Sequence, residues 1–123
     1  MKMLLLDVYN NKVSIVNATG LDDYYKHLGC RCIDIVRRKI GDIEVEIIVD
    51  DEGLLVENPK PSAIGANGEI MLVGNLLIAS GKVIDGELTG LKKKELENIL
   101  NYFGEITIPT YSEPYKVLTG MGY

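Results

Sequence analysis

One stretch of the chain, residues 24–51, holds most of the side chains that could do chemistry. It contains the only histidine, His27, both cysteines, Cys30 and Cys32, and Arg31, followed by a basic run at positions 37–39. Such a group could form a metal site, a redox site or an anion-binding strand. It could also be a β-hairpin whose charges only keep it in solution, and the spacing of the residues helps to separate these possibilities.

The cysteines fit neither a metal site nor a disulfide. A structural zinc site needs four ligands, usually from two Cys-x-x-Cys-like pairs, and this stretch supplies three. A Cys-x-Cys pair would close a very small ring with poor disulfide geometry, and a cytosolic setting would keep it reduced. Two residues apart on a strand, both thiols would point to one face, which suits burial. We therefore expect core cysteines, no metal and no cofactor.

Conventional catalysis finds little support in the residue types. Any Ser-His-Asp or Cys-His site would have to use His27, which lies near the end of a short predicted helix. The glycine-containing segments match neither the phosphate-loop pattern nor the dinucleotide-binding pattern. We therefore expect the protein not to be an enzyme.

Charge and hydropathy limit the partners. A net charge of -5 argues against binding to a nucleic-acid backbone, which needs a clustered basic surface. The 18 acidic residues are interspersed with 13 basic ones, whereas a DNA mimic would show acidic blocks. No apolar run is long enough for a bilayer span or a signal peptide, so we expect a cytoplasmic protein without membrane contact.

Two hairpins are predicted in the first half of the chain. Residues 3–9 and 12–17 would pair around an Asn-Asn loop, with Leu6 opposite Ile15. Residues 30–50 would form the second hairpin around Gly41-Asp42, which suits a type II′ turn. The predicted pairs of this hairpin are Ile40–Ile43, Lys39–Glu44, Arg38–Val45, Arg37–Glu46 and Val36–Ile47.

The second half alternates between irregular and regular segments. Residues 57–68 contain two prolines and two glycines, which predicts a loop. Residues 71–80 are apolar on both faces and predict a central strand, interrupted by a bulge or close approach at Gly74-Asn75. Residues 82–88 are expected to form an edge segment.

Helical periodicity predicts two helices. Residues 21–28 would form a short helix that ends at Gly29, and residues 91–103 carry an apolar stripe that ends at Gly104. The order of elements predicts an α+β domain over residues 1–104, with a mainly antiparallel sheet of about five strands built from two hairpins and a central strand, and two helices packed on it. Residues 105–123 form an aromatic tail that we expect to pack on the body or on a partner subunit.

The predicted register leaves two arginines without an assigned partner. Arg38 shares a face with apolar residues, and an arginine there needs an anion or a carbonyl cluster. It could extend past the sheet edge, pair with Glu95 or Glu97, or bind an anionic ligand. Arg31 has no acid assigned across the hairpin either.

The loop that follows the hairpin supplies further candidates. Lys60, Ser62 and Asn67, with the nearby glycine amides, would suit a phosphate or a nucleobase edge. The alternative is a crossover that only connects strands.

An ordered set of motifs carries a family resemblance. The strings GCRCIDIVRRKIG, DDEGLL, NPKPSA, NGE and MLVGN together resemble the domain-of-unknown-function family 3846. The resemblance implies a small protein of phages and mobile elements of Gram-positive gut bacteria, working in an infected or lysogenic host. It supplies no catalytic residues.

That setting suggests a protein that blocks host defence. We expect a non-catalytic sponge, which binds a cyclic or ADP-ribose-type nucleotide signal and removes it from solution. The site would be shared across a homodimer or higher homo-oligomer. The candidate ligand residues are Arg31, Arg38, Lys60, Ser62, Asn67, Asn75, Tyr111 and Tyr115. The alternatives are an antirestriction-type DNA mimic and an interaction module without a small ligand.

Overall fold

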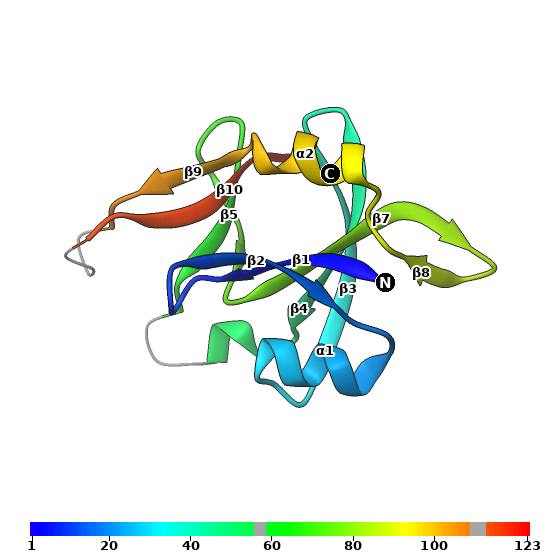
Figure 1. Cartoon of the computed structure of the whole chain (residues 1–123). Coiled ribbons are helices and arrows are strands. Elements are labelled where there is room, and N and C mark those ends of the chain that lie inside the picture. The colour runs from blue at the N-terminus through cyan, green and yellow to red at the C-terminus, as the bar shows by residue number, and fades with distance from the viewer. Residues whose placement is uncertain (56–58, 109–112) are drawn as a thin grey trace.

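The computed structural model describes residues 1–55, 59–108 and 113–123 (Figure 1). The described residues form ten strands, two α-helices and one 3-10 helix. In chain order they are β1 (Lys2–Asp7), β2 (Lys12–Asn17), α1 (Leu21–Leu28), β3 (Ile33–Ile40), β4 (Ile43–Asp50), the 3-10 helix η1 (Gly53–Leu55), β5 (Pro61–Gly65), β6 (Ile70–Val73), β7 (Leu76–Ile84), β8 (Glu87–Thr89), α2 (Lys93–Leu100), β9 (Phe103–Ile106) and β10 (Tyr115–Gly122).

All ten strands belong to one mixed sheet. Its order is β2-β1-β7-β4-β3-β10-β5-β6, with β8 paired to β7 and β9 paired to β10. Strands β10 and β5 run parallel, whereas the other pairs are antiparallel. The prediction of an α+β domain with about five strands is therefore wrong, because three segments expected as loop, helix end and tail contain strands.

Apolar side chains on both faces of the sheet are buried. The larger cluster joins residues of β1, β4, β7 and β10 to Leu96 and Ile99 of α2. On the other face, Tyr24 and Leu28 of α1 pack among Met3, Ala18, Ile48, Leu77 and Ala79. Figure 1 shows the two helices on opposite sides of the molecule. The central strands are therefore buried on both faces.

The first hairpin forms with a different register. Leu6 pairs with Val13, so its predicted pairing with Ile15 is wrong by two residues. The turn is longer because the Asp7 carboxylate accepts hydrogen bonds from the backbone and side-chain N–H groups of Asn10, which ends β1 at Asp7. An even shift keeps the same side chains on the core face.

The second hairpin and the first helix match their predictions. All five predicted pairs between β3 and β4 are present. Gly41 has a φ of 60°, as the first central position of a type II′ turn requires. Helix α1 covers the predicted residues, and its C-terminal cap is Gly29, whose backbone has the left-handed conformation. Each of these elements is specified by residues close together in the sequence.

The predicted central strand at residues 71–80 is in fact two strands. Strand β6 lies at the edge of the sheet and β7 in its middle. The chain turns between them at Gly74, whose φ is 78°, and the Asn75 side chain accepts a hydrogen bond from the Val8 N–H. The expected edge segment at residues 82–88 is the hairpin between β7 and β8.

The predicted loop at residues 57–68 contains β5, which pairs with β6 and, in parallel, with β10. Glu57 and Asn58 lie outside the described residues. The second helix is shorter than predicted, because Phe103 pairs with Leu118 and begins β9. Strand β10, within the segment expected as a tail, lies between β3 and β5.

The joint between β5 and β10 gives a test of the fold. Tyr115 is 2% exposed, and its O–H donates a 2.7 Å hydrogen bond to the Pro61 carbonyl. Tyr115→Phe leaves that carbonyl without this donor, so we expect the free energy of unfolding to fall by about 1–2 kcal/mol in urea denaturation. Tyr123→Phe, at an 88% exposed position, is the control and should change it by less than about 0.5 kcal/mol. Equal stability of the two variants would contradict this role.

Candidate functional site

The predicted ligand residues lie in separate parts of the structure. Arg31 lines a cavity of about 260 Å³ together with Asp50 and Glu52, at the start of β3. Asn67 is exposed in the turn between β5 and β6. Arg38 lies near the other end of β3, and Tyr111 lies outside the described residues. The described structure therefore does not gather these residues into one site.

Four of the predicted residues lie on or beside β5. The Lys60 ammonium lies 4.2 Å from the centre of the Tyr115 ring, and the Lys60 carbonyl accepts a hydrogen bond from the Gly74 N–H. Asn75, the residue after Gly74, accepts a hydrogen bond from the N–H of Val8, which directly follows β1. Ser62 is fully buried, and its Oγ has no hydrogen-bond partner among the described residues. The bonds at Lys60, Asn75 and Tyr115 connect residues at or next to the ends of strands, which is a structural role.

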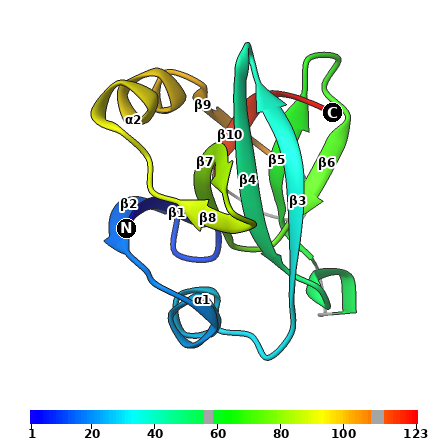
Figure 2. The same ribbon diagram turned by 90° about the vertical axis from the view of Figure 1, so that its right-hand side faces the viewer.

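A groove of about 310 Å³ lies between β3 and β6. Figure 2 shows β6 beside β3. Apolar and acidic side chains line this groove, together with Gly53. Its lining residues are Asp34, Val36, Val49, Asp50, Asp51, Gly53, Leu54, Ile70, Met71, Leu72 and Val73. The sequence analysis missed this groove, because its walls meet only through long-range pairing.

Strand β3 borders the groove with an edge that is largely unpaired. Strand β10 pairs only with Ile40 and Lys39 of β3. No other described strand pairs with β3 on the side away from β4. Backbone groups of alternate residues point to the same edge, so those of Ile35 and Arg37 share the side on which Gly41 donates to Gly120.

Side chains of β3 itself satisfy two of these edge groups. The Ile35 N–H donates to the Asp34 carboxylate at 2.9 Å. The Arg37 carbonyl accepts a hydrogen bond from the Arg38 guanidinium at 2.8 Å. Asp34 also lines the groove, which places the groove at the unpaired edge. Edge strands commonly use such charged side chains to block pairing with other chains.

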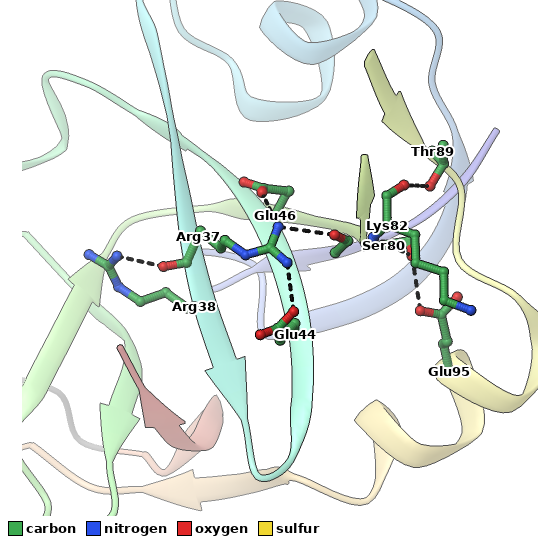
Figure 3. Close-up of polar contacts among 9 residues, drawn as sticks. Arg37, Arg38, Glu44, Glu46, Ser80, Lys82, Thr89 and Glu95 are labelled. Carbon is green, nitrogen blue, oxygen red and sulfur yellow. Dashed lines mark hydrogen bonds and ion pairs between the residues drawn. The ribbon is translucent and has the colours of Figure 1, made fainter. Parts of the chain in front are cut away.

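Arg37 and Arg38 have opposite surroundings (Figure 3). Arg37 donates to the carboxylates of Glu44 and Glu46, both at 2.7 Å, and to the Gly81 carbonyl. The hydrogen bond to Glu46 is the main cause that raises the pKa of Arg37, and the hydrogen bond to Glu44 is the second. The predicted pairing of Arg37 with Glu46 is confirmed, and Glu44 binds Arg37 rather than Lys39.

Arg38 has no carboxylate within ion-pair distance in the described part of the chain. Its guanidinium carbon lies 4.9 Å from the centre of the Tyr123 ring, and its buried Nε has no hydrogen-bond partner among the described residues. The expected alternative partner Glu95 instead accepts hydrogen bonds from Ser80 and from the Lys92 N–H, which fixes α2. Arg38 therefore retains the capacity to donate to an anion.

The cysteines differ from the prediction that both belong to the core. Cys30 is half-buried and Cys32 is exposed. Both residues precede β3, so they do not take part in the alternation of side chains between the two faces of that strand. Burial raises the pKa of the Cys30 thiol, and a hydrogen bond to Glu52 raises the pKa of the Cys32 thiol. No group of three or more potential metal-binding residues occurs in the described part of the chain.

Comparison with known proteins places the chain in a family. The family described as Domain of unknown function (DUF3846) matches residues 1–104. The chain belongs to this family. The resemblance seen in its motifs is thus confirmed, and all residues that line the groove lie within the DUF3846 region. No curated protein and no solved structure matches the chain. None of the helices in the described residues is long and apolar enough to cross a membrane.

The cysteine surroundings predict low thiol reactivity. A raised pKa leaves less thiolate at a given pH, so both thiols should be alkylated by iodoacetamide more slowly than free cysteine near pH 8.5. Glu52→Gln removes the carboxylate and should lower the pKa of Cys32, measured from the pH dependence of alkylation. If, in the protein without this substitution, the pH midpoint of alkylation lay at or below the midpoint for free cysteine, the prediction would be contradicted.

Proposed function

We propose that this protein acts by stoichiometric binding rather than by catalysis, and that its binding surface is the groove between β3 and β6. The observation that carries the proposal is the lining of the groove, where Val36, Val49 and Met71 lie beside carboxylates. Apolar walls with a few convergent polar groups are typical of binding sites.

The charge of the lining favours a cationic ligand. Asp34, Asp50 and Asp51 contribute three carboxylates, and no lysine or arginine occurs among the described lining residues. Like charges placed together across an interface disfavour binding, so this groove is unfavourable for phosphates. A ligand with apolar groups and a positive charge complements it. Sequestering a host component in this way would serve the anti-defence role expected from the sequence, without catalytic residues.

Sequestration of a nucleotide signal remains a second candidate, and the observation that favours it is Arg38. Its guanidinium has no acidic partner in the described structure, one of its donors is unused there, and the exposed Tyr123 ring lies beside it. Arginine and an aromatic ring are a common pair for a phosphate and a base. Arg31 and Asn67 lie elsewhere and do not support this site.

A pair of small probes tests the groove. We expect acetyl-leucyl-lysine amide to shift the NMR resonances of Val36, Met71 and Leu72 saturably, because its charge complements the carboxylates. Acetyl-leucyl-glutamate amide should bind at least about tenfold more weakly. Asp34→Asn combined with Asp51→Asn removes two of the three groove carboxylates and should reduce this difference, whereas Asp85→Asn, on the β7–β8 turn, should retain it in full. The proposal would be contradicted if both probes bound equally well, or if neither probe bound.

A thermal-shift panel of cyclic nucleotides and ADP-ribose derivatives tests the second candidate. A sequestered nucleotide at saturating concentration should raise the melting temperature by roughly 5 °C or more. It should be recovered intact after heating. Arg38→Gln should abolish the shift, and Lys39→Gln, on the opposite face of β3, should retain it. No shift with any compound would exclude this candidate, and a hydrolysed product would indicate an enzyme.

A further inference from the structure

We infer that the ligand of the groove is a linear polyamine, an alkyl chain with two or more ammonium groups, which extends from the groove into a second cavity. This inference rests on the binding role proposed above. The second cavity has a volume of about 410 Å³. Its lining residues are Tyr9, Leu28, Gly29, Asp50, Gly53, Gly74 and Asn75. Asp50 and Gly53 also line the groove, so the two cavities adjoin at these residues.

The carboxylates of Asp34 and Asp50 lie on opposite faces of the sheet. Asp34 pairs with Val49 across the β3–β4 hairpin, so these two side chains share a face. Asp50, the next residue, points to the other face, where Leu28 of α1 packs beside Ile48. By strand geometry the two carboxylates are roughly 8–10 Å apart. A single ammonium group cannot contact both, whereas the two ends of a short alkyl chain can.

Neither carboxylate has a basic partner in the described part of the chain, where both ion pairs belong to Arg37. Oδ1 of Asp50 accepts a 2.9 Å hydrogen bond from the Glu52 N–H, which is a neutral donor. Arg31 lines a further cavity together with Asp50, but no described ion pair joins them. A ligand ammonium beside Asp50 would therefore supply the missing counter-charge, at a partly apolar site where charge attraction is stronger than in water.

The second cavity suits an ammonium group at the end of an alkyl chain. Leu28 offers an apolar contact, and Tyr9 offers an aromatic ring, whose face attracts cations. Gly29 caps the C-terminus of α1, where the helix carbonyl groups carry partial negative charge. No lysine or arginine occurs among the described lining residues of either cavity.

The apolar walls favour an alkyl chain over a peptide or a metal ion. Val36, Val49 and Met71 line the groove beside its carboxylates. A peptide placed against these walls would bring amide groups that lose water and need hydrogen-bond partners, whereas the methylene groups of a polyamine need none. A metal ion would match the charge alone, and no group of three or more potential metal-binding residues occurs in the described residues.

Two amines of equal chain length test the inference. 1,6-Diaminohexane, whose extended length is close to the carboxylate separation, differs from 6-aminohexan-1-ol by its second ammonium group. Calorimetric titration in about 150 mM salt, which screens exposed charges, should show at least about tenfold tighter binding of the diamine. In NMR titrations only the diamine should saturably shift both Leu72 of the groove and Asn75 of the second cavity.

A pair of matched variants locates the second ammonium group. Asp50→Asn removes the charge but keeps a side-chain oxygen that can accept from the Glu52 N–H, so the fold should be retained. It should reduce the preference for the diamine to less than about threefold. Asp85→Asn, at an exposed position on the β7–β8 turn, changes the net charge equally and should retain the preference. Equal losses in the two variants would show that only the net charge attracts the amine, and would overturn the inference.

The outcomes separate this inference from the proposed function. Equal binding of the diamine and the amino alcohol, or no binding of either, would overturn the polyamine assignment. Displacement of the diamine by an equal concentration of magnesium chloride would overturn it too, because the site would then recognise charge alone. The groove would still stand as a binding surface if the leucyl-lysine probe binds with charge selectivity, whereas loss of that selectivity would contradict the proposed function itself.

Discussion

The pairing between β10 and β3 determines much of the architecture around the groove. It consists of Ile40 with Met121 and Lys39 with Gly122, extended by the hydrogen bond from Gly41 to Gly120. On one side of this joint the sheet continues through β4, β7, β1 and β2, and on the other through β5 and β6. Because the joint is short, the rest of β3 has an edge with no strand beside it in the described structure, and β6 faces β3 across a groove instead of pairing with it.

This edge explains the different surroundings of two adjacent arginines. Arg37 points to the face where Glu44 and Glu46 lie on the neighbouring strand, and it binds both. Arg38 points to the other face, where the neighbours across the hairpin are apolar, and its guanidinium reaches the unpaired edge. Asp34 does the same further along the strand. The side chains of Asp34 and Arg38 hinder other chains from pairing with this edge.

The sequence predicted the parts of the fold that local residues specify. The Gly41-Asp42 turn and the alternating charges fixed every predicted pair of the β3–β4 hairpin, and the lack of an acid across from Arg38 was visible in that register. Strands β5 and β10 escaped prediction, because their parallel pairing joins distant segments rich in proline, glycine and tyrosine. The groove was missed for the same reason. Asp34 and Val36 line the groove from β3, in a hairpin that the local sequence predicts. Met71 and Leu72 line it only because the path of β5 and β6 brings them there.

Hydrogen exchange of individual backbone amides along β3 in the free protein tests most directly whether this edge is open. The N–H groups of Val36 and Arg38 face β4, whereas that of Arg37 faces the proposed open edge. The account predicts alternating protection, with Arg37 exchanging much faster than Val36 and Arg38, and renewed protection at Lys39, where β10 begins to pair. Uniformly slow exchange from Val36 to Lys39 would show that another segment or another copy covers the edge, and would contradict the account.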